Sequence, residues 1–263
     1  MTYFIEGLQG VGKTTLVSNL SEKFPGYKVF REGDYSPVEL AWCAYLAIGE
    51  YEKILCKYSE IADEIRANTT EEMYGSDIRY VVTYTKIITD IPGFHKDLEQ
   101  YEIYNGRIDK KSFEDIIFSR YSKWAESDQI LECSIFQNIV ENQILFYEMT
   151  DDEIIDFYRK LKAILGNRDY KILYLEPENI AETINVIRKE RVDDKGNEIW
   201  YQLMLGFLKE CPYGIHHELE GFDDLIRHLE HRKNLELRII HEVFEDCAVI
   251  LKSKKYDLTH INL

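Results

Sequence analysis

The sequence has 263 residues, of which 45% are hydrophobic and 30% charged, as in soluble globular proteins. Its 48 acidic and 32 basic residues give a formal net charge of −16, which disfavours binding to nucleic acids or anionic membranes. No apolar run is long enough for a transmembrane helix, and no signal-peptide pattern is present at the N-terminus. The five cysteines are widely spaced and form no C-x-x-C pair, which favours free thiols in a reducing compartment. We therefore expect a cytoplasmic protein with neither nucleic-acid nor membrane partners.

The first segment of the chain carries a phosphate-binding pattern. Residues 7–14 match G-x-x-x-x-G-K-S/T, after an apolar stretch at 3–5 that predicts a strand and before apolar positions at 16–20 that predict a helix. The glycines allow turns that place backbone N–H groups and the helix N-terminus around a polyphosphate. Lys13 is expected to reach the β- and γ-phosphates of ATP, and the Thr14 hydroxyl to bind Mg²⁺. The expected nucleotide contacts are Gly7, Gly10, Val11, Gly12, Lys13, Thr14 and Thr15.

Four further strands follow, separated by helical segments. Short apolar runs predict them at 27–31, 129–133, 170–175 and 247–251. The order strand, loop, helix, strand predicts parallel pairing of the first two strands through a right-handed crossover. We therefore expect an α/β fold with three layers and a five-stranded parallel sheet.

Helix signals fill most of the remaining sequence. Residues 38–125 carry few strand signals and are interpreted as a large helical insertion, with one helix over about 38–68 and another from Ser76 to about Asp90. Thr150 and Glu153 fit a capping box for a helix that ends at Gly166. Further helices are predicted near 135–148 and over 222–244. Between them, one helix is predicted to start at about 180 and another to end at about 209.

At this point the chain resembles a known family. Residues 5–14 are similar to the I-E-G-x-x-G-x-G-K-S/T opening of the P-loop kinases of the thymidylate kinase and deoxynucleoside kinase group. Arg31, Glu32 and Pro37 match the T-R-E-P-G-G-T-P segment of the thymidylate kinases. The Glu-Cys-Ser at 132–134 resembles E-R-S of the deoxynucleoside kinases, and 172–178 looks like L-Y-L-x-x-x-P-E. The resemblance implies a P-loop NTPase fold in one kinase-like domain, residues 1–263, with the insertion at about 38–125 and a lid at about 186–200.

The resemblance also implies roles for individual residues. Glu32 corresponds to the family's general base for the acceptor hydroxyl; alternatively it forms a structural ion pair, and Asp34 is a second candidate base. Arg188 and Arg191 stand where the family has its arginine-rich lid and share one helix face, although a solvated basic helix end has the same pattern.

Two features concern metal and phosphate binding. Glu132 lies at the end of the third predicted strand and could bind Mg²⁺ directly or through water, or serve as an acidic residue at a helix N-terminus. Cys133 occupies the position of a phosphate-directed arginine in the family, so another arginine has to replace it; the candidates are Arg31, Arg79 and Arg120. The late histidines do not form H-E-x-x-H, and we expect no zinc site.

The remaining candidates concern the second substrate and the base of the nucleotide. Several aromatic residues of the insertion could stack on a planar substrate or belong to the core: Trp42, Tyr45, Tyr80, Tyr84, Tyr121 and Trp124. The basic turn at 252–255 could lie near the adenine or be a solvated tail.

Together these features predict an ATP- and Mg²⁺-dependent kinase that phosphorylates a small acceptor. The acceptor is expected to be nucleoside-like or nucleotide-like, and another small molecule such as an antibiotic is a variant of this prediction. The alternative is a nucleotide-binding switch or regulatory ATPase without a small-molecule acceptor. The expected partners are a nucleoside triphosphate and the acceptor, with a homodimer as one candidate assembly.

Overall fold

The computed structural model describes residues 1–125, 127–256 and 258. They form two compact units, one made of Met1–Val29 with Glu126–Leu263 and the other of Phe30–Ala125. The second unit corresponds closely to the insertion expected at 38–125. We describe each unit by itself.

The first unit is built on a five-stranded parallel sheet, so the expected α/β fold is confirmed. The strand order is β2-β6-β1-β7-β8, and Phe4 of β1 lies opposite Leu131 of β6 and Ile172 of β7. The expected pairing of the first two strands is wrong, because β6 lies between β1 and β2. The strands are β1 Thr2–Gly7, β2 Lys28–Phe30, β6 Gln129–Glu132, β7 Tyr170–Glu176 and β8 Ala248–Lys252.

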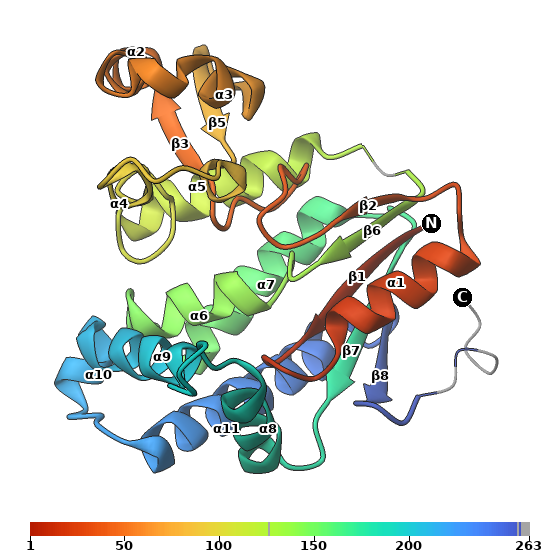
Figure 1. Cartoon of the computed structure of the whole chain (residues 1–263). Coiled ribbons are helices and arrows are strands. Elements are labelled where there is room, and N and C mark those ends of the chain that lie inside the picture. Colours follow the sequence, from red (N-terminus) through yellow and green to blue (C-terminus); the bar gives the residue numbers. More distant parts are fainter. Residues whose placement is uncertain (126, 257, 259–263) are drawn as a thin grey trace. The chain divides into compact units, whose positions relative to one another are not determined.

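Helices flank this sheet on both faces. Helix α1 (Lys13–Lys23) leads from β1 toward the β2 edge, whereas α6 (Gln137–Leu145) and α7 (Asp151–Leu165) lead from β6 toward the β8 edge (Figure 1). Right-handed crossovers that run in opposite directions place their helices on opposite faces of a parallel sheet. The alternation along β1 agrees with this, because Tyr3 stacks on Phe24 after α1 whereas the Glu6 carboxylate bonds to the segment that starts α6.

The helices predicted around and after β7 are present. Thr150 is the N-cap of α7 and accepts a hydrogen bond from the backbone N–H of Glu153, whose carboxylate accepts one from the N–H of Thr150 at 2.9 Å. The helix stops at Gly166, which has a φ of 58°. The remaining elements are α8 Ile180–Glu190, α9 Ile199–Glu210, α10 Pro212–His216, α11 Phe222–Ile239 and a π-helical turn at Ile240–Phe244.

The second unit contains strands that the sequence interpretation missed. Its antiparallel sheet has the strand order β3-β5-β4. The prediction of a helix from Ser76 is wrong, because this segment forms strand β5. A two-residue turn joins β4 to β5, with Tyr74 opposite Asp77 and Gly75 at a φ of 62°. That Gly-containing turn between β-branched and aromatic residues is a hairpin signal. The elements are β3 Ala44–Ala47, α2 Ile48–Lys57, α3 Ala62–Ala67, β4 Thr69–Tyr74, β5 Asp77–Val82, α4 Phe94–Glu99 and α5 Lys110–Lys123, with 3-10 turns at Ser59–Ile61 and Tyr84–Lys86.

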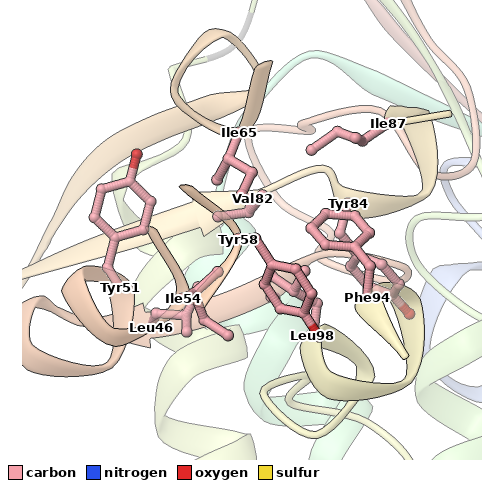
Figure 2. Packing of buried hydrophobic residues seen from close by; sticks show 11 residues of the cluster. Leu46, Tyr51, Ile54, Tyr58, Ile65, Val82, Tyr84, Ile87, Phe94 and Leu98 are labelled. Carbon is pink, nitrogen blue, oxygen red and sulfur yellow. The ribbon is translucent and has the colours of Figure 1, made fainter. Parts of the chain in front are cut away.

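Apolar side chains from both sheet and helices form the core of this unit (Figure 2). Tyr51 of α2 stacks on Tyr80 of β5 at 4.3 Å between ring centroids, and Tyr58 meets Phe94 of α4 edge to face. Most aromatic candidates for substrate stacking are buried in the unit, namely Tyr45, Tyr84, Tyr121 and Trp124. Trp42 differs, because it is 48% exposed. Within the described part of the chain, no helix combines the length and apolarity needed to cross a membrane.

Candidate functional site

The loop between β1 and α1 is shaped by its glycines. Gly10 has a φ of 76°, and a Cβ on it would lie 2.1 Å from Cδ1 of Ile187, so helix α8 packs directly on the loop. Gly12 has a φ of 95° and is the N-cap of α1, and a Cβ there would meet no atom within 4 Å. The loop is therefore packed against α8 at Gly10 and has free space beside Gly12, and an anion at the N-terminus of α1 would be stabilised by the helix dipole.

Lys13 is buried, and its ammonium group is turned toward the loop. Its Nζ donates to the carbonyl oxygens of Gly7 at 2.8 Å and Leu8 at 2.7 Å, and to Oε1 of Gln137 at 2.8 Å. A lysine has three donors, so all of them are in use. Gln137, the first residue of α6, was not singled out from the sequence, because no motif marks it and it is 124 residues away along the chain.

The two residues predicted to bind Mg²⁺ lie together. The Thr14 hydroxyl donates to Oε1 of Glu132 at 2.8 Å, because β6 neighbours β1 in the sheet and both end at the same edge. Glu132 is 7% exposed, and Cys133 after it has a left-handed φ of 55° that ends the strand. A hydroxyl and a carboxylate oxygen suit Mg²⁺, which completes its shell with water and phosphate oxygens. Among the described residues no group of three or more metal-binding side chains occurs, and such a magnesium site needs none.

Glu6 lies fully buried beneath the loop. Burial raises the pKa of its carboxyl to about 7, against the opposing effect of hydrogen bonds from the backbone N–H groups of Ile135, at 2.8 Å, and Gln137, at 3.2 Å. The same residue thus anchors the start of α6, the helix that presents Gln137 to Lys13.

The turn after β8 also reaches the loop. The Ser253 hydroxyl donates to the carbonyl of Val11 at 2.7 Å, and its N–H donates to the carbonyl of Glu176 at 2.9 Å. Lys255 pairs with Glu178 at 2.6 Å. The basic turn predicted at 252–255 is therefore in contact with the loop, and its role toward an adenine stays a prediction. Ser253 itself was missed, since a lone serine carries no sequence signal.

The two predicted lid arginines have different surroundings. Arg188 bonds to the Glu198 carboxylate through Nε at 2.9 Å and Nη2 at 2.7 Å, and its guanidinium lies 4.1 Å from the ring centroid of Tyr201. Arg191 follows α8, is exposed, and lies 5.5 Å from the ring of Trp200. Arg188 thus joins α8 to the segment around α9, whereas Arg191 remains accessible to a ligand.

The predicted base belongs to the second unit. Oε1 of Glu32 accepts a hydrogen bond from Nε1 of Trp42 at 3.2 Å, and Trp42 has a left-handed φ of 64°, which is rare for so bulky a residue. Asp34, the other candidate base, accepts a bond from the backbone N–H of Arg31 and pairs with Lys86 at 2.6 Å.

All three candidates to replace the missing phosphate-directed arginine belong to the second unit: Arg31, Arg79 and Arg120. Arg79 lies over the ring of Tyr45, and Arg120 pairs with Glu72. Their role toward phosphate stays a prediction.

The first unit thus brings Lys13, Thr14 and Glu132 together at one end of its sheet. No protein family model and no curated protein matches this sequence. The chemistry of the site is therefore interpreted from its own residues: an open helix N-terminus, a lysine ammonium and a hydroxyl–carboxylate pair.

Proposed function

We propose that this protein is an ATP- and Mg²⁺-dependent phosphotransferase that acts on a small acceptor, nucleoside-like or nucleotide-like. The observation that carries the proposal is the 2.8 Å hydrogen bond between Thr14 and Glu132 beside a glycine loop that precedes α1. Positive groups for phosphate and oxygen ligands for a metal are two of the requirements of phosphoryl transfer that a protein must supply.

Each residue of the loop has a separate task. Backbone N–H groups and the N-terminus of α1 hold the phosphates, and Lys13 turns from the carbonyls of Gly7 and Leu8 toward them. Thr14 and Glu132 would hold Mg²⁺ directly or through water, and the ion would supply positive charge toward the phosphate oxygens.

The family resemblance assigns two further residues, Glu32 and Arg191, to the acceptor and the transferred group. Glu32 accepts the proton of the acceptor hydroxyl, since a carboxylate at the position of the family's base can serve as a general base and Trp42 Nε1 orients it by a hydrogen bond. Arg191 stabilises charge on the transferred group, since it is exposed beyond the end of α8, whereas Arg188 is held by Glu198.

The substitution Lys13→Ala tests the phosphate site. We expect ATP affinity to fall roughly 10- to 100-fold, as for loss of charge-assisted hydrogen bonds, and ADP release in the presence of acceptors to cease. Lys23→Ala, in the exposed last turn of the same helix, is the matched control and should retain both properties.

Titration calorimetry and a screen of acceptors for ADP release give the two readouts. Unchanged ATP affinity and turnover in Lys13→Ala would contradict the assignment of the glycine loop as the phosphate site. ATP binding without transfer to any acceptor would instead favour the nucleotide-binding switch.

A further inference from the structure

The first unit contains a cavity that the proposed site does not use. It has a volume of about 290 Å³, close to the lower limit for small-molecule sites, and lies between α10 and the first turns of α11. Both helices pack against α6 (Figure 1). Three of the late histidines meet here, and the polar residues that line the cavity are Tyr213, His217, Asp224, Arg227, His228 and His231.

His228 is buried, and only one of its ring nitrogens is bonded. Its side chain is 2% exposed, and Nε2 donates to Oε1 of Glu141 on α6 at 3.1 Å. The other nitrogen, Nδ1, is buried and has no hydrogen-bond partner among the described residues. A buried polar atom without a partner costs free energy, and in native proteins such an atom usually meets a protein group, a water molecule or a ligand.

The charges behind His228 favour a proton on Nδ1. Arg232 is fully buried and bonds to the carboxylates of Glu141 at 2.8 Å and Glu236 at 2.9 Å. Burial would raise the pKa of the Glu141 carboxyl, but the charges of His228 and Arg232 lower it to about 2. Two carboxylates therefore face one guanidinium, and a positive charge on His228 balances them. An imidazolium carries N–H on both nitrogens, so Nδ1 offers a hydrogen to an acceptor in the cavity.

The acidic residue of the lining has its oxygens in use. Oδ2 of Asp224 accepts the backbone N–H groups of Glu220 and Gly221, both at 2.9 Å, and Oδ1 pairs with Nη2 of Arg227. Arg227 is exposed and has five N–H donors, of which this pair uses one. A cation in the cavity would thus meet an arginine and an occupied carboxylate, whereas an anion would meet unused donors.

The other polar side chains of the lining also supply donors. Burial raises the pKa of the Tyr213 phenol, so its hydroxyl keeps its proton and can donate. His217 stacks on the Tyr213 ring with 4.1 Å between the centroids, which restrains both rings. His231 uses Nε2 toward Asp151 at 2.8 Å and keeps Nδ1 for another contact. The cavity therefore gathers hydrogen-bond donors on positively charged or protonatable groups.

We propose that this cavity binds a small oxyanion, namely a carboxylate or a phosphate group of a small compound. Nδ1 of His228 donates to one oxygen of this group, and Arg227 pairs with another at the exposed rim. The chain as a whole has a net charge of −16, which disfavours anions elsewhere on its surface, so binding depends on this local cluster. The site does not depend on the proposed kinase activity.

Two substitutions of His228 separate its two nitrogens, and calorimetry on the full chain with inorganic phosphate and with succinate measures the effect. The amide nitrogen of glutamine is as many bonds from Cα as Nε2, and that of asparagine as many as Nδ1. His228→Gln can therefore keep the bond to Glu141 but lacks Nδ1, and we expect both anions to bind at least tenfold more weakly. His228→Asn keeps a donor at Nδ1 and should retain more of the affinity.

Thermal melts distinguish binding from support of the structure. His228→Asn loses the bond to Glu141, so it should melt at a lower temperature than His228→Gln while binding the anions more tightly. Anion affinities that instead follow the melting temperatures, with His228→Asn the weaker binder, would show that His228 is only structural and would overturn the proposal.

A pair of arginines on α11 tests the rim. Arg227→Ala should weaken both anions several-fold. Arg238→Ala is the matched control, because Arg238 lies on the same helix, pairs with Asp152 and Glu242 and does not line the cavity. It should leave both affinities unchanged. Equal affinities of the two arginine variants would contradict an anion at the rim.

The remaining outcomes identify the anion and separate this site from the glycine loop. Tighter binding of phosphate than of succinate assigns a phosphate-bearing ligand, and the reverse order a carboxylate. Anion binding retained in Lys13→Ala supports the cavity, whatever happens to ATP, whereas loss of both anions in that variant would place them at the loop. No binding of either anion to the wild type, or equal affinities of the wild type and His228→Gln, overturns the proposal and leaves the ATP measurement intact.

Discussion

Lys13 holds the positive charge on which the phosphate site depends, and in this structure its three donors are bonded inward. Two of the acceptors, the carbonyls of Gly7 and Leu8, belong to the loop itself. The third is the side chain of Gln137, which is fixed because its backbone N–H is bonded to Glu6. A bound phosphate therefore competes with Gln137 for the lysine.

Substitutions at Gln137 should change ATP affinity in opposite directions. Gln137→Met keeps the length of the side chain but removes the acceptor, so ATP should bind several-fold more tightly. Gln137→Glu places a carboxylate beside the ammonium and repels phosphate, so ATP should bind at least tenfold more weakly. Titration with ATP measures both, and a decrease in both variants would show that Gln137 only supports the structure.

Arg188, in the last turn of α8, and Arg191, directly after this helix, should respond differently to substitution. Arg191→Ala should lower turnover and leave the melting temperature unchanged, because its side chain is exposed. Arg188→Ala should lower the melting temperature by a few degrees, because it loses the Glu198 pair and the contact with Tyr201. Turnover and thermal melts separate them. Wild-type turnover in Arg191→Ala would place that residue on the solvated surface.

At the scale of elements, α8 connects the loop to the predicted lid. Its Ile187 packs at Gly10, so the middle of the helix is fixed against the loop. Arg191, one turn later, lies beyond the helix end. A rigid helix with an exposed basic end is suited to present a positive charge at a constant distance from bound phosphate.

Both ends of helix α7 are specified by local residues, a capping box at its start and Gly166 at its end. The contribution of the N-cap to stability can be measured directly. Thr150→Ala removes the hydroxyl that accepts the Glu153 N–H, and we expect a loss of about 1 kcal/mol in the free energy of unfolding. Thr150→Ser, which keeps the hydroxyl, should lose much less. Denaturant unfolding measures the difference, and ATP affinity should remain unchanged. Equal stabilities of the two variants would contradict the role of the cap.

At the scale of the whole molecule, buried carboxyl groups couple stability to pH. Burial raises the pKa of Glu6 and Glu102 to about 7 and that of Glu39 to about 8, from an ordinary value of 4.5. Burial would also raise the pKa of Glu141, but the neighbouring charges of His228 and Arg232 lower it to about 2. Between about pH 4.5 and 8, the carboxyl groups of Glu6, Glu102 and Glu39 bind more protons in the folded than in the unfolded chain. At low pH the carboxyl group of Glu141 binds fewer protons in the folded chain.

We therefore expect the protein to be most stable near pH 5. As pH rises from about 4.5 to 8 the three raised groups lose their protons in the folded state, and the free energy of unfolding falls; below about 4.5 protonation of Glu141 also lowers it. Denaturant unfolding over pH 4 to 8 measures the curve. Glu39→Gln should make the curve flatter toward pH 8. A wild-type free energy of unfolding that rises toward pH 8 would contradict the raised pKa values of the buried carboxyl groups.

Local sequence patterns specified the features that depend on neighbouring residues. Glycine spacing specified the loop at 7–14, apolar runs specified the five sheet strands, and a capping box with Gly166 specified both ends of α7. The sequence also nominated Thr14 and Glu132 as magnesium ligands, but their contact depends on β6 lying next to β1.

The contacts between distant segments became known from the folded structure alone. It placed β6 between β1 and β2, turned the expected helix after Ser76 into a hairpin strand, and brought Gln137 and Ser253 to the loop. The structure also showed that Arg188 is paired with Glu198, whereas Arg191 is exposed. Periodicity and spacing describe the near neighbours of a residue along the chain, whereas strand order and the bonds of Gln137 and Ser253 to the loop depend on packing between segments more than a hundred residues apart.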